Sequence, residues 1–170
     1  LEQWVIRNDT DGTDRALFDD STTPQYRALD WLSNDNYLHE SDPSNVQILE
    51  RYVLAVLYFS TDGDNWLDSK LVFLAEGPIC SWDPSRTWNT SRTNITDNYW
   101  TDNTCGSDGC PVGALCGNGS YVQTIRLTGV GLSGTIPWEL SLLSDLSSLI
   151  LPLNFLNGSI PAELGRMPSL

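Results

Sequence analysis

The side chains that most often carry hydrolytic chemistry are sparse in this sequence. The single histidine, His39, lies in a polar stretch, and the serine of "GLSGT" lacks the glycine spacing of a nucleophile elbow. The adjacent carboxylates Asp19 and Asp20 could act as acid and base, but no feature of the sequence encloses a substrate around them. A phosphate-binding loop and a dinucleotide-binding glycine motif are both missing. The sequence therefore predicts that the protein is not an enzyme and uses no cofactor.

Calcium is the metal that the acidic residues favour most, although the pattern is incomplete. In "DGDNWLD", the carboxylates of Asp62, Asp64 and Asp68 are closely spaced, and hard oxygen ligands at such spacing can bind Ca²⁺. The stretch lacks the remaining ligands of a complete calcium-binding loop, and Asp-Gly is also an ordinary turn. We therefore expect no metal site and keep these three aspartates as weak calcium candidates.

The cysteines point to disulfides in place of a metal. All four lie within one segment, at intervals of 25, 5 and 6 residues, whereas zinc sites favour C-x2-C pairs. This spacing predicts two disulfide bonds formed in an oxidising compartment. The cysteines are Cys80, Cys105, Cys110 and Cys116.

Five N-x-[ST] sequons agree with an oxidising compartment, because N-glycans are added to secreted and cell-surface proteins. Together with the cysteines they predict an extracellular glycoprotein, secreted or held at the cell surface. The candidate glycosylation sites are Asn8, Asn89, Asn94, Asn118 and Asn157.

The net charge of −13 and the pI near 4.1 exclude some classes of partner. Nucleic acids and anionic membrane surfaces attract Lys and Arg, so neither is expected to bind. The longest apolar run, "YVLAVLYF", is too short to cross a bilayer, and membrane association is expected only through segments outside this chain. Cations, basic proteins and neutral glycans remain possible partners.

Two helices are predicted in the first half of the chain. Thr23 is placed as the N-cap of the first, with Pro24 at the first helical position and an apolar face of Tyr26, Leu29 and Leu32. For the second, longer helix we expect Asp42 as the cap, Pro43 in the first turn and an end at Gly63.

The second half of the chain contains an internal repeat. The motif G-x-I-P-x-E-L occurs at Gly134 and again at Gly158, an offset of 24 residues. It follows a strand-like segment, residues 121–127, that is rich in β-branched side chains. Apolar residues recur in both copies and are expected to face inward, so each copy would bury them against its neighbour. The first copy has Val122, Ile125, Leu127, Leu132, Ile136, Leu140 and Leu143, and the second has Leu146, Leu149, Leu151, Leu156, Ile160, Leu164 and Met167.

The second copy resembles the plant-type leucine-rich repeat, L-x-x-L-x-L-x-x-N-x-L-x-G-x-I-P-x-x-L. Leu146, Asn154 and Gly158 occupy its leucine, asparagine and glycine positions. The first copy departs from the pattern at Val130, where the family has Asn, and the second at Pro152. Upstream, "ICSW" and "ALCGNGSYVQTIRL" are similar to the N-terminal cap that precedes such repeats in plant extracellular proteins.

This resemblance implies an α/β repeat fold, with a helical, disulfide-bonded N-terminal cap followed by the start of a right-handed leucine-rich-repeat solenoid. The regions would be an acidic N-terminal segment (1–22), the cap (23–120) with a disulfide-tied insertion (81–110), and two repeats (121–170). A face left without a polar cap predicts that the solenoid continues or that a partner covers it. The cap cysteines of the family would place one disulfide at Cys80–Cys116 and the other at Cys105–Cys110; the alternative is Cys80–Cys105 with Cys110–Cys116.

The resemblance also implies recognition in place of catalysis. A ligand would bind outward positions on the concave face, which are Thr124, Arg126, Thr128, Ser148, Ile150 and Pro152. Three hypotheses follow: an extracellular domain that binds a protein, peptide or glycan; a structural subunit of an extracellular assembly or filament; and a repeat-type inhibitor of a secreted enzyme.

Overall fold

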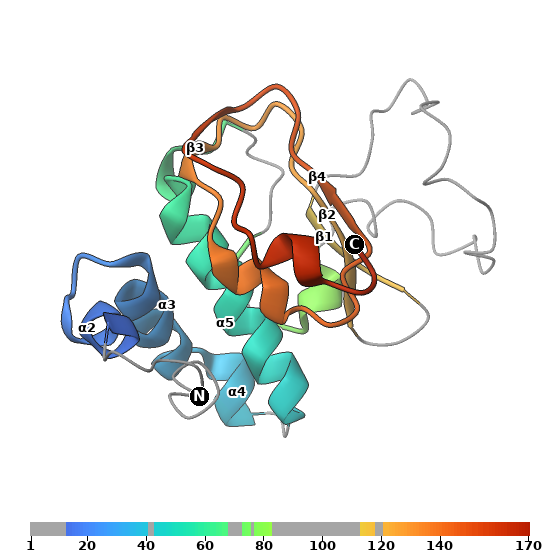
Figure 1. Cartoon of the computed structure of the whole chain (residues 1–170). Helices are drawn as coiled ribbons and strands as arrows, with labels where there is room; N and C mark the ends of the chain where they lie inside the picture. Colours follow the sequence, from blue (N-terminus) through green and yellow to red (C-terminus); the bar gives the residue numbers. More distant parts are fainter. Residues whose placement is uncertain (1–12, 41–42, 68–72, 76, 83–112, 118–120) are drawn as a thin grey trace.

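The structure is a computed structural model of the chain that describes residues 13–40, 43–67, 73–75, 77–82, 113–117 and 121–170 (Figure 1). Helices come first in chain order and short strands follow. The helices are α2 (Thr13–Asp19), α3 (Pro24–Ser33), α4 (Asn36–Glu40) and α5 (Asn45–Ser60). The strands are β1 (Gly113–Cys116), β2 (Val122–Arg126), β3 (Ser133–Thr135), β4 (Ser148–Ile150) and β5 (Phe155–Asn157). None of the described helices is both long and apolar enough to cross a membrane.

Helix α3 begins where the sequence predicts. The hydroxyl of Thr23 accepts a hydrogen bond from the backbone N–H of Tyr26 at 3.2 Å, and Pro24 follows as the first helical residue. The buried side chains of the helix are those of Ala28 and Leu32. Tyr26, expected on the apolar face, is 36% exposed.

Helix α5 starts and ends at other residues than predicted. Its N-cap is Ser44, not Asp42, which lies outside the described residues. Ser44 and Gln47 form a reciprocal capping box: the Ser44 N–H donates to Gln47 Oε1 at 3.0 Å, and the Gln47 N–H donates to Ser44 Oγ at 3.3 Å. Two backbone N–H groups at the start of the helix are thereby satisfied. The helix ends at Ser60, before Gly63, with Thr61 as C-cap.

Helix α5 is the centre of the core. Every residue of Tyr52–Leu57 is fully buried, so this part of the helix is covered on all sides. In Figure 1, α5 lies between α3 and the strands, and both pack against it. Ala28 and Leu32 of α3 and Ile125 of β2 belong to the same apolar cluster.

The strands form two small sheets. In the first, β2 is the central strand, antiparallel to β1 and parallel to β4. In the second, β3 and β5 are parallel. The N–H of Ser133 donates to the carbonyl of Thr61 at 3.0 Å and so fixes β3 to the end of α5.

The predicted right-handed leucine-rich-repeat solenoid is wrong. The described residues form helices, one mixed three-stranded sheet and one two-stranded sheet, with no solenoid. The two parallel ladders also differ in register: Thr124 pairs with Ser148, 24 residues on, whereas Ser133 pairs with Phe155, 22 residues on.

The physical reason is that the two copies of the motif lie in different surroundings. Leu132 in the first copy is fully buried, but the equivalent Leu156 is only half-buried. Ile136 is half-buried, and its counterpart Ile160 is 75% exposed. The first copy packs against α5, and the second does not repeat this environment.

Candidate functional site: the outward face of the three-stranded sheet

The structure brings the predicted ligand-contacting residues together on two paired strands. Thr124 of β2 lies opposite Ser148 of β4, and Arg126 lies opposite Ile150. All four side chains are half-buried. We call these four residues the strip. The two other predicted positions follow the strands directly: Thr128 is half-buried after β2, and Pro152 is exposed after β4.

The strip faces outward because its neighbours in the sequence face inward. Side chains alternate between the two faces of a strand, and Ile125 and Leu127 are both fully buried in the core. Thr124 and Arg126 must then lie on the opposite face. The strip is thus a row of polar and apolar side chains on strands whose other face packs against the core.

Asn154 fixes the turn that follows β2. Its Oδ1 accepts hydrogen bonds from the backbone N–H groups of residues 130–132, at 3.1, 3.0 and 3.1 Å. Its Nδ2 donates to the carbonyl of Leu127 at 2.6 Å. An asparagine of the second copy therefore satisfies the turn of the first, in which Val130 stands at the family's asparagine position.

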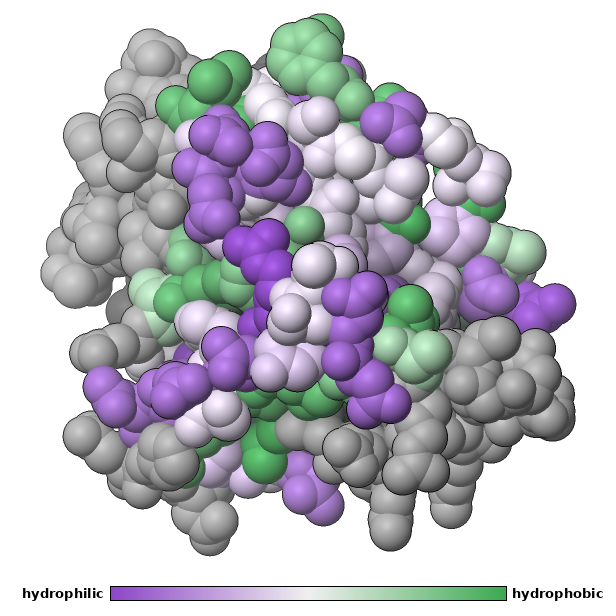
Figure 2. Space-filling model, turned by 90° about the vertical axis from the view of Figure 1, so that its left-hand side faces the viewer, coloured by the Kyte–Doolittle hydropathy of each residue, from purple (hydrophilic) through white to green (hydrophobic). Residues whose placement is uncertain are grey.

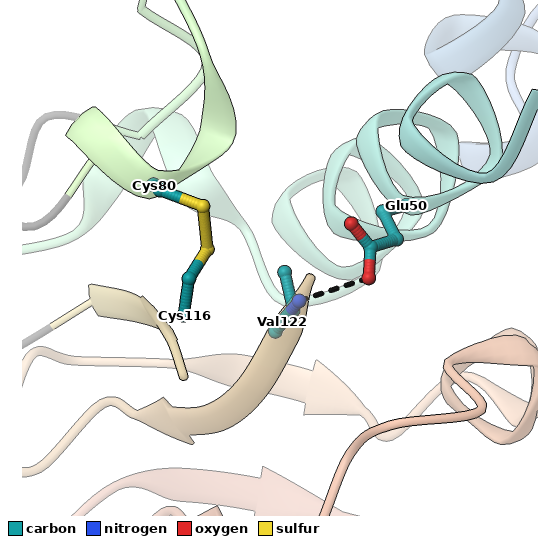
Figure 3. Close-up of a disulfide and its surroundings, with 4 residues drawn as sticks. All are labelled: Glu50, Cys80, Cys116 and Val122. Carbon is teal, nitrogen blue, oxygen red and sulfur yellow. Dashed lines mark hydrogen bonds between the residues drawn. A yellow bond between two sulfur atoms is a disulfide. The ribbon is translucent and has the colours of Figure 1, made fainter. Parts of the chain in front are cut away.

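A disulfide fixes the far edge of the sheet. Cys80, in the 3₁₀ helix η3 (Ile79–Ser81), is bonded to Cys116 at the end of β1 (Figure 3). This is the pairing implied by the resemblance. Cys105 and Cys110, and so the second predicted disulfide, lie outside the described residues.

Glu50 joins α5 to the start of β2, close to this disulfide (Figure 3). Its Oε1 accepts the backbone N–H of Val122 at 2.9 Å, and the residue is 3% exposed. Its Oε2 is buried without a hydrogen-bond partner. Burial raises the pKa of Glu50 to about 7; the Val122 bond opposes this rise and the charge of Asp145 adds to it.

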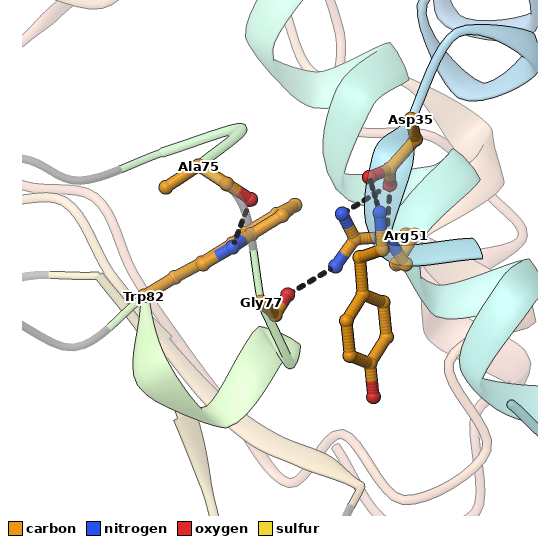
Figure 4. A network of polar contacts seen from close by, with 6 residues as sticks. Asp35, Arg51, Ala75, Gly77 and Trp82 are labelled. Atoms are coloured by element: carbon orange, nitrogen blue, oxygen red, sulfur yellow. Dashed lines mark hydrogen bonds and ion pairs between the residues drawn. The ribbon is translucent and has the colours of Figure 1, made fainter. Parts of the chain in front are cut away.

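The neighbouring Arg51 is a buried charge that is fully paired (Figure 4). Its Nε donates to Asp35 Oδ2 at 2.6 Å, its Nη2 contacts the same oxygen, and its Nη1 donates to the Gly77 carbonyl at 2.7 Å. Nearby, the indole N–H of Trp82 donates to the Ala75 carbonyl at 2.9 Å. The Arg51–Gly77 bond attaches the segment that carries Cys80 to the helical core, and the Trp82–Ala75 bond closes that segment on itself. The centroids of three aromatic rings lie within 5.3 Å of the guanidinium carbon of Arg51, and the rings are those of Trp31, Tyr37 and Trp82.

The calcium candidates that the structure describes already have protein partners. Asp62 accepts from the Asn65 side chain at 2.9 Å. Asp64 accepts from the Tyr58 hydroxyl at 2.9 Å and pairs with Arg27 at 3.2 Å. Burial and the Asp64 carboxylate raise the pKa of Tyr58 to about 12. Asp68 lies outside the described residues, and within them no three His, Cys, Asp or Glu side chains gather as metal ligands would.

Of the predicted glycosylation sites, the structure describes Asn157, which is exposed in β5. The other four, Asn8, Asn89, Asn94 and Asn118, lie outside the described residues. His39 belongs to α4, and its side chain is not among those described.

Sequence reasoning missed the roles of Glu50, Arg51 and Asp35. A signal was present, because the adjacent charges Glu50 and Arg51 lie within the longest predicted helix and directly precede its long apolar run. Charged residues are seldom fully buried unless they are paired. The identity of their partners, Asp35 and Val122, depends on the tertiary structure.

About half of the chain is similar to segments of plant proteins. It is 41% identical over 83 residues to Protein MALE DISCOVERER 2 of Arabidopsis thaliana, a match that covers 49% of this chain and 10% of that protein. It is 35% identical over 88 residues to a probable inactive receptor kinase of the same plant, covering 51% of this chain and 12% of the kinase. Protein MALE DISCOVERER 1, also of Arabidopsis thaliana, is 49% identical over 49 residues, which are 29% of this chain and 7% of that protein.

The chain therefore spans about a tenth of the length of these relatives. No protein-family model matches it, and no solved structure matches it at a significant level.

Proposed function

We propose that this chain is an extracellular recognition domain of a plant receptor-like protein, which binds a protein, peptide or glycan and catalyses no reaction. The observation that carries the proposal is the similarity to a plant protein described as a probable inactive receptor kinase. A matched segment that is a small part of a much longer chain fits a binding module better than a complete enzyme.

The chemistry of the chain supports an extracellular location. The chain forms the Cys80–Cys116 disulfide, and structural disulfides are typical of oxidising compartments and rare in reducing ones. The negative net charge favours basic or neutral partners over nucleic acid. Any association with a membrane would use segments outside this chain.

The strip supports a binding role because its side chains offer different chemical groups and because the backbone that carries them is held in place. Thr124 and Ser148 offer hydroxyl groups, Arg126 offers a guanidinium and Ile150 an apolar contact. Such a mixture suits a polar ligand with some apolar surface. The turn held by Asn154 and the buried side chains beneath the strands hold the backbone in place before binding, which lowers the entropy lost on association.

A second candidate function is that of a structural subunit in an extracellular assembly, and the strand edges favour it. Within the described residues, β4 pairs only with β2 and β5 only with β3, so each leaves one edge open. An exposed apolar side chain follows each strand in the sequence: Leu153, 82% exposed, comes after β4, and Ile160, 75% exposed, comes after β5. Open edges with apolar neighbours are sites where other chains can pair. A defined oligomer measured by light scattering would favour this function, and a monomer would oppose it.

The test of the recognition function is a binding screen with a matched pair of variants. The secreted chain is immobilised and exposed to a panel of purified plant extracellular domains and secreted peptides. Ser148→Arg alters the strip, and Ser133→Arg makes the same change on β3, in the other sheet. We expect a partner whose Kd rises at least about tenfold for Ser148→Arg and is unchanged for Ser133→Arg. A partner that both variants bind like the wild type would place the site elsewhere.

A further inference from the structure

Phe155 is the most exposed aromatic residue in the described part of the chain, with 71% of its surface accessible. It lies in β5, two residues before Asn157, which begins the sequon Asn157-Gly158-Ser159. A large apolar ring left in water has an unfavourable hydration free energy that a covering group would relieve.

The ring and the asparagine lie on the same face of β5. Leu156, between them, packs against the core, whereas Phe155 and Asn157 are both exposed. Alternate residues of a strand point the same way and are about 7 Å apart along it. That separation is comparable to the width of one sugar ring with its linkage to asparagine.

We propose that Asn157 carries an N-linked glycan whose first N-acetylglucosamine stacks on the ring of Phe155. The proposal rests on the extracellular function proposed above, because N-glycans are added in the secretory pathway. It adds to the predicted sequon a specific role for its neighbour: Phe155 is the platform for the sugar.

The chemistry of the two surfaces is complementary. One face of the sugar ring consists of C–H groups, which carry a small positive charge, and the face of an aromatic ring is electron-rich, so the C–H groups pack against the ring face as the edge of one aromatic ring packs on the face of another. On the adjacent strand, the residues opposite Phe155 and Asn157 are Ser133 and Thr135. Both are exposed and small, so neither blocks a sugar lying across the face.

Gly158 sets the backbone turn in the middle of the sequon. Its φ of +76° turns the chain directly after Asn157, and a Cβ at this position would lie 3.1 Å from Thr135 Cγ2. Ser159, which completes the sequon, is exposed.

Figure 2 shows apolar side chains along the upper edge of the molecule. In Figure 1, β3 and the turns beside it lie at the same height. A glycan at Asn157 would cover part of the apolar surface beside β5 and hinder another strand from pairing there.

The first experiment is glycopeptide mass spectrometry of the whole chain secreted from plant or insect cells. We expect Asn157 to be occupied. If Asn157 is vacant while Asn89, Asn94 or Asn118 carries glycan, this inference fails and the extracellular assignment stands. If every sequon is vacant in protein taken from its natural source, both fail.

The second experiment is a double-mutant cycle that measures melting temperature. Asn157→Gln should lower Tm by about 2–4 °C when Phe155 is present, and by nothing measurable in a Phe155→Ala background. Ile160→Ala removes another exposed apolar side chain beyond the sequon, and in that background the loss should persist. Enzymatic trimming to a single N-acetylglucosamine should keep Tm at the glycosylated value. An equal loss with and without Phe155, or a loss on trimming, would overturn the stacking.

Discussion

At the scale of single residues, the adjacent charges Glu50 and Arg51 show two ways of burying an ionisable group. Arg51 stays charged because Asp35 neutralises it and hydrogen bonds satisfy it. Glu50 takes part in neither ion pair found among the described residues, and its single hydrogen bond comes from the Val122 N–H. Glu139, in the 3₁₀ helix that packs against α5, accepts a hydrogen bond from Gln25. Asp145 repels a Glu50 carboxylate and so helps to raise the pKa of Glu50. Glu50 is therefore the residue at which pH should act on this fold.

The first prediction concerns the pH dependence of stability. The pKa of Glu50 rises from 4.5, its ordinary value, to about 7 in the folded chain. Between these values the folded state binds the proton more tightly than the unfolded state, so the free energy of unfolding falls as pH rises. From pH 4.5 to above pH 7 this single group should lower stability by about 3 kcal/mol. Urea titrations at pH 5 and pH 8 measure the difference.

Glu50→Gln supplies the contrast, because the amide keeps an oxygen for the Val122 N–H and cannot ionise. This variant should lose most of the pH-dependent change, whereas Glu163→Gln, which changes a half-buried glutamate far from Glu50 in the sequence, should keep it. A wild-type slope retained in Glu50→Gln would show that another group titrates.

The second prediction concerns the buried ion pair. Asp35→Ala leaves the Arg51 guanidinium buried without its counter-charge and should lower the free energy of unfolding by about 3–5 kcal/mol. The exposed pair Arg27–Asp64 is the matched control, with 43% and 66% of the side chains accessible. Asp64→Ala should change stability by no more than about 1 kcal/mol. Similar losses for the two variants, measured by urea unfolding, would contradict this account of the network.

At the scale of elements, one asparagine connects strands that belong to different copies of the repeated motif. Asn154 bonds to backbone groups of the turn between β2 and β3, and to carbonyls next to β4. Both sheets therefore depend on the same amide. Because the strands are only three to five residues long, side-chain bonds of this kind must supply much of their order.

The third prediction follows from this position. Asn154→Ala leaves three neighbouring N–H groups, partly shielded from water, without their acceptor and should lower stability by about 3 kcal/mol. Asn154→Asp keeps the accepting oxygen and loses only the donor, so its loss should be smaller. Urea unfolding ranks the three proteins, and an alanine variant as stable as the aspartate variant would contradict the assigned role of Oδ1.

At the scale of the whole molecule, the sequence predicted what depends on local chemistry. The Thr23 cap, the Pro24 start and the strand at 122–126 depend on neighbouring residues and could be predicted. The absence of a solenoid could not be predicted from neighbouring residues. Ile136 and Ile160 occupy the same position of the motif, but what covers each is decided by α5, which is far away in the sequence.

The candidate site shows the same division. The resemblance placed positions 124, 126, 148 and 150 on one outward face, and in the structure Thr124 and Arg126 pair with Ser148 and Ile150. The supports of the strip were harder to predict. The bond between Glu50 and Val122 spans 72 residues, and no local pattern specifies a contact at that distance.

The fourth prediction concerns the disulfide, which closes a loop of 36 residues between η3 and β1. In the chain-entropy model, removing it should lower the free energy of unfolding by about 4 kcal/mol. Cys80→Ser with Cys116→Ser tests this by urea unfolding in parallel with the wild type. Unchanged stability would show that the core and the Arg51 network alone hold β1 in place.

The most direct test of the recognition function is a hydrogen–deuterium exchange footprint of a bound partner on this chain. The strip predicts that binding slows exchange in peptides covering β2 and β4, with α2 and α3 unchanged. The Ser148→Arg variant should lose that protection together with its affinity. Protection confined to the β3–β5 sheet or to the helices, with β2 and β4 exchanging as in the free chain, would contradict the proposed site.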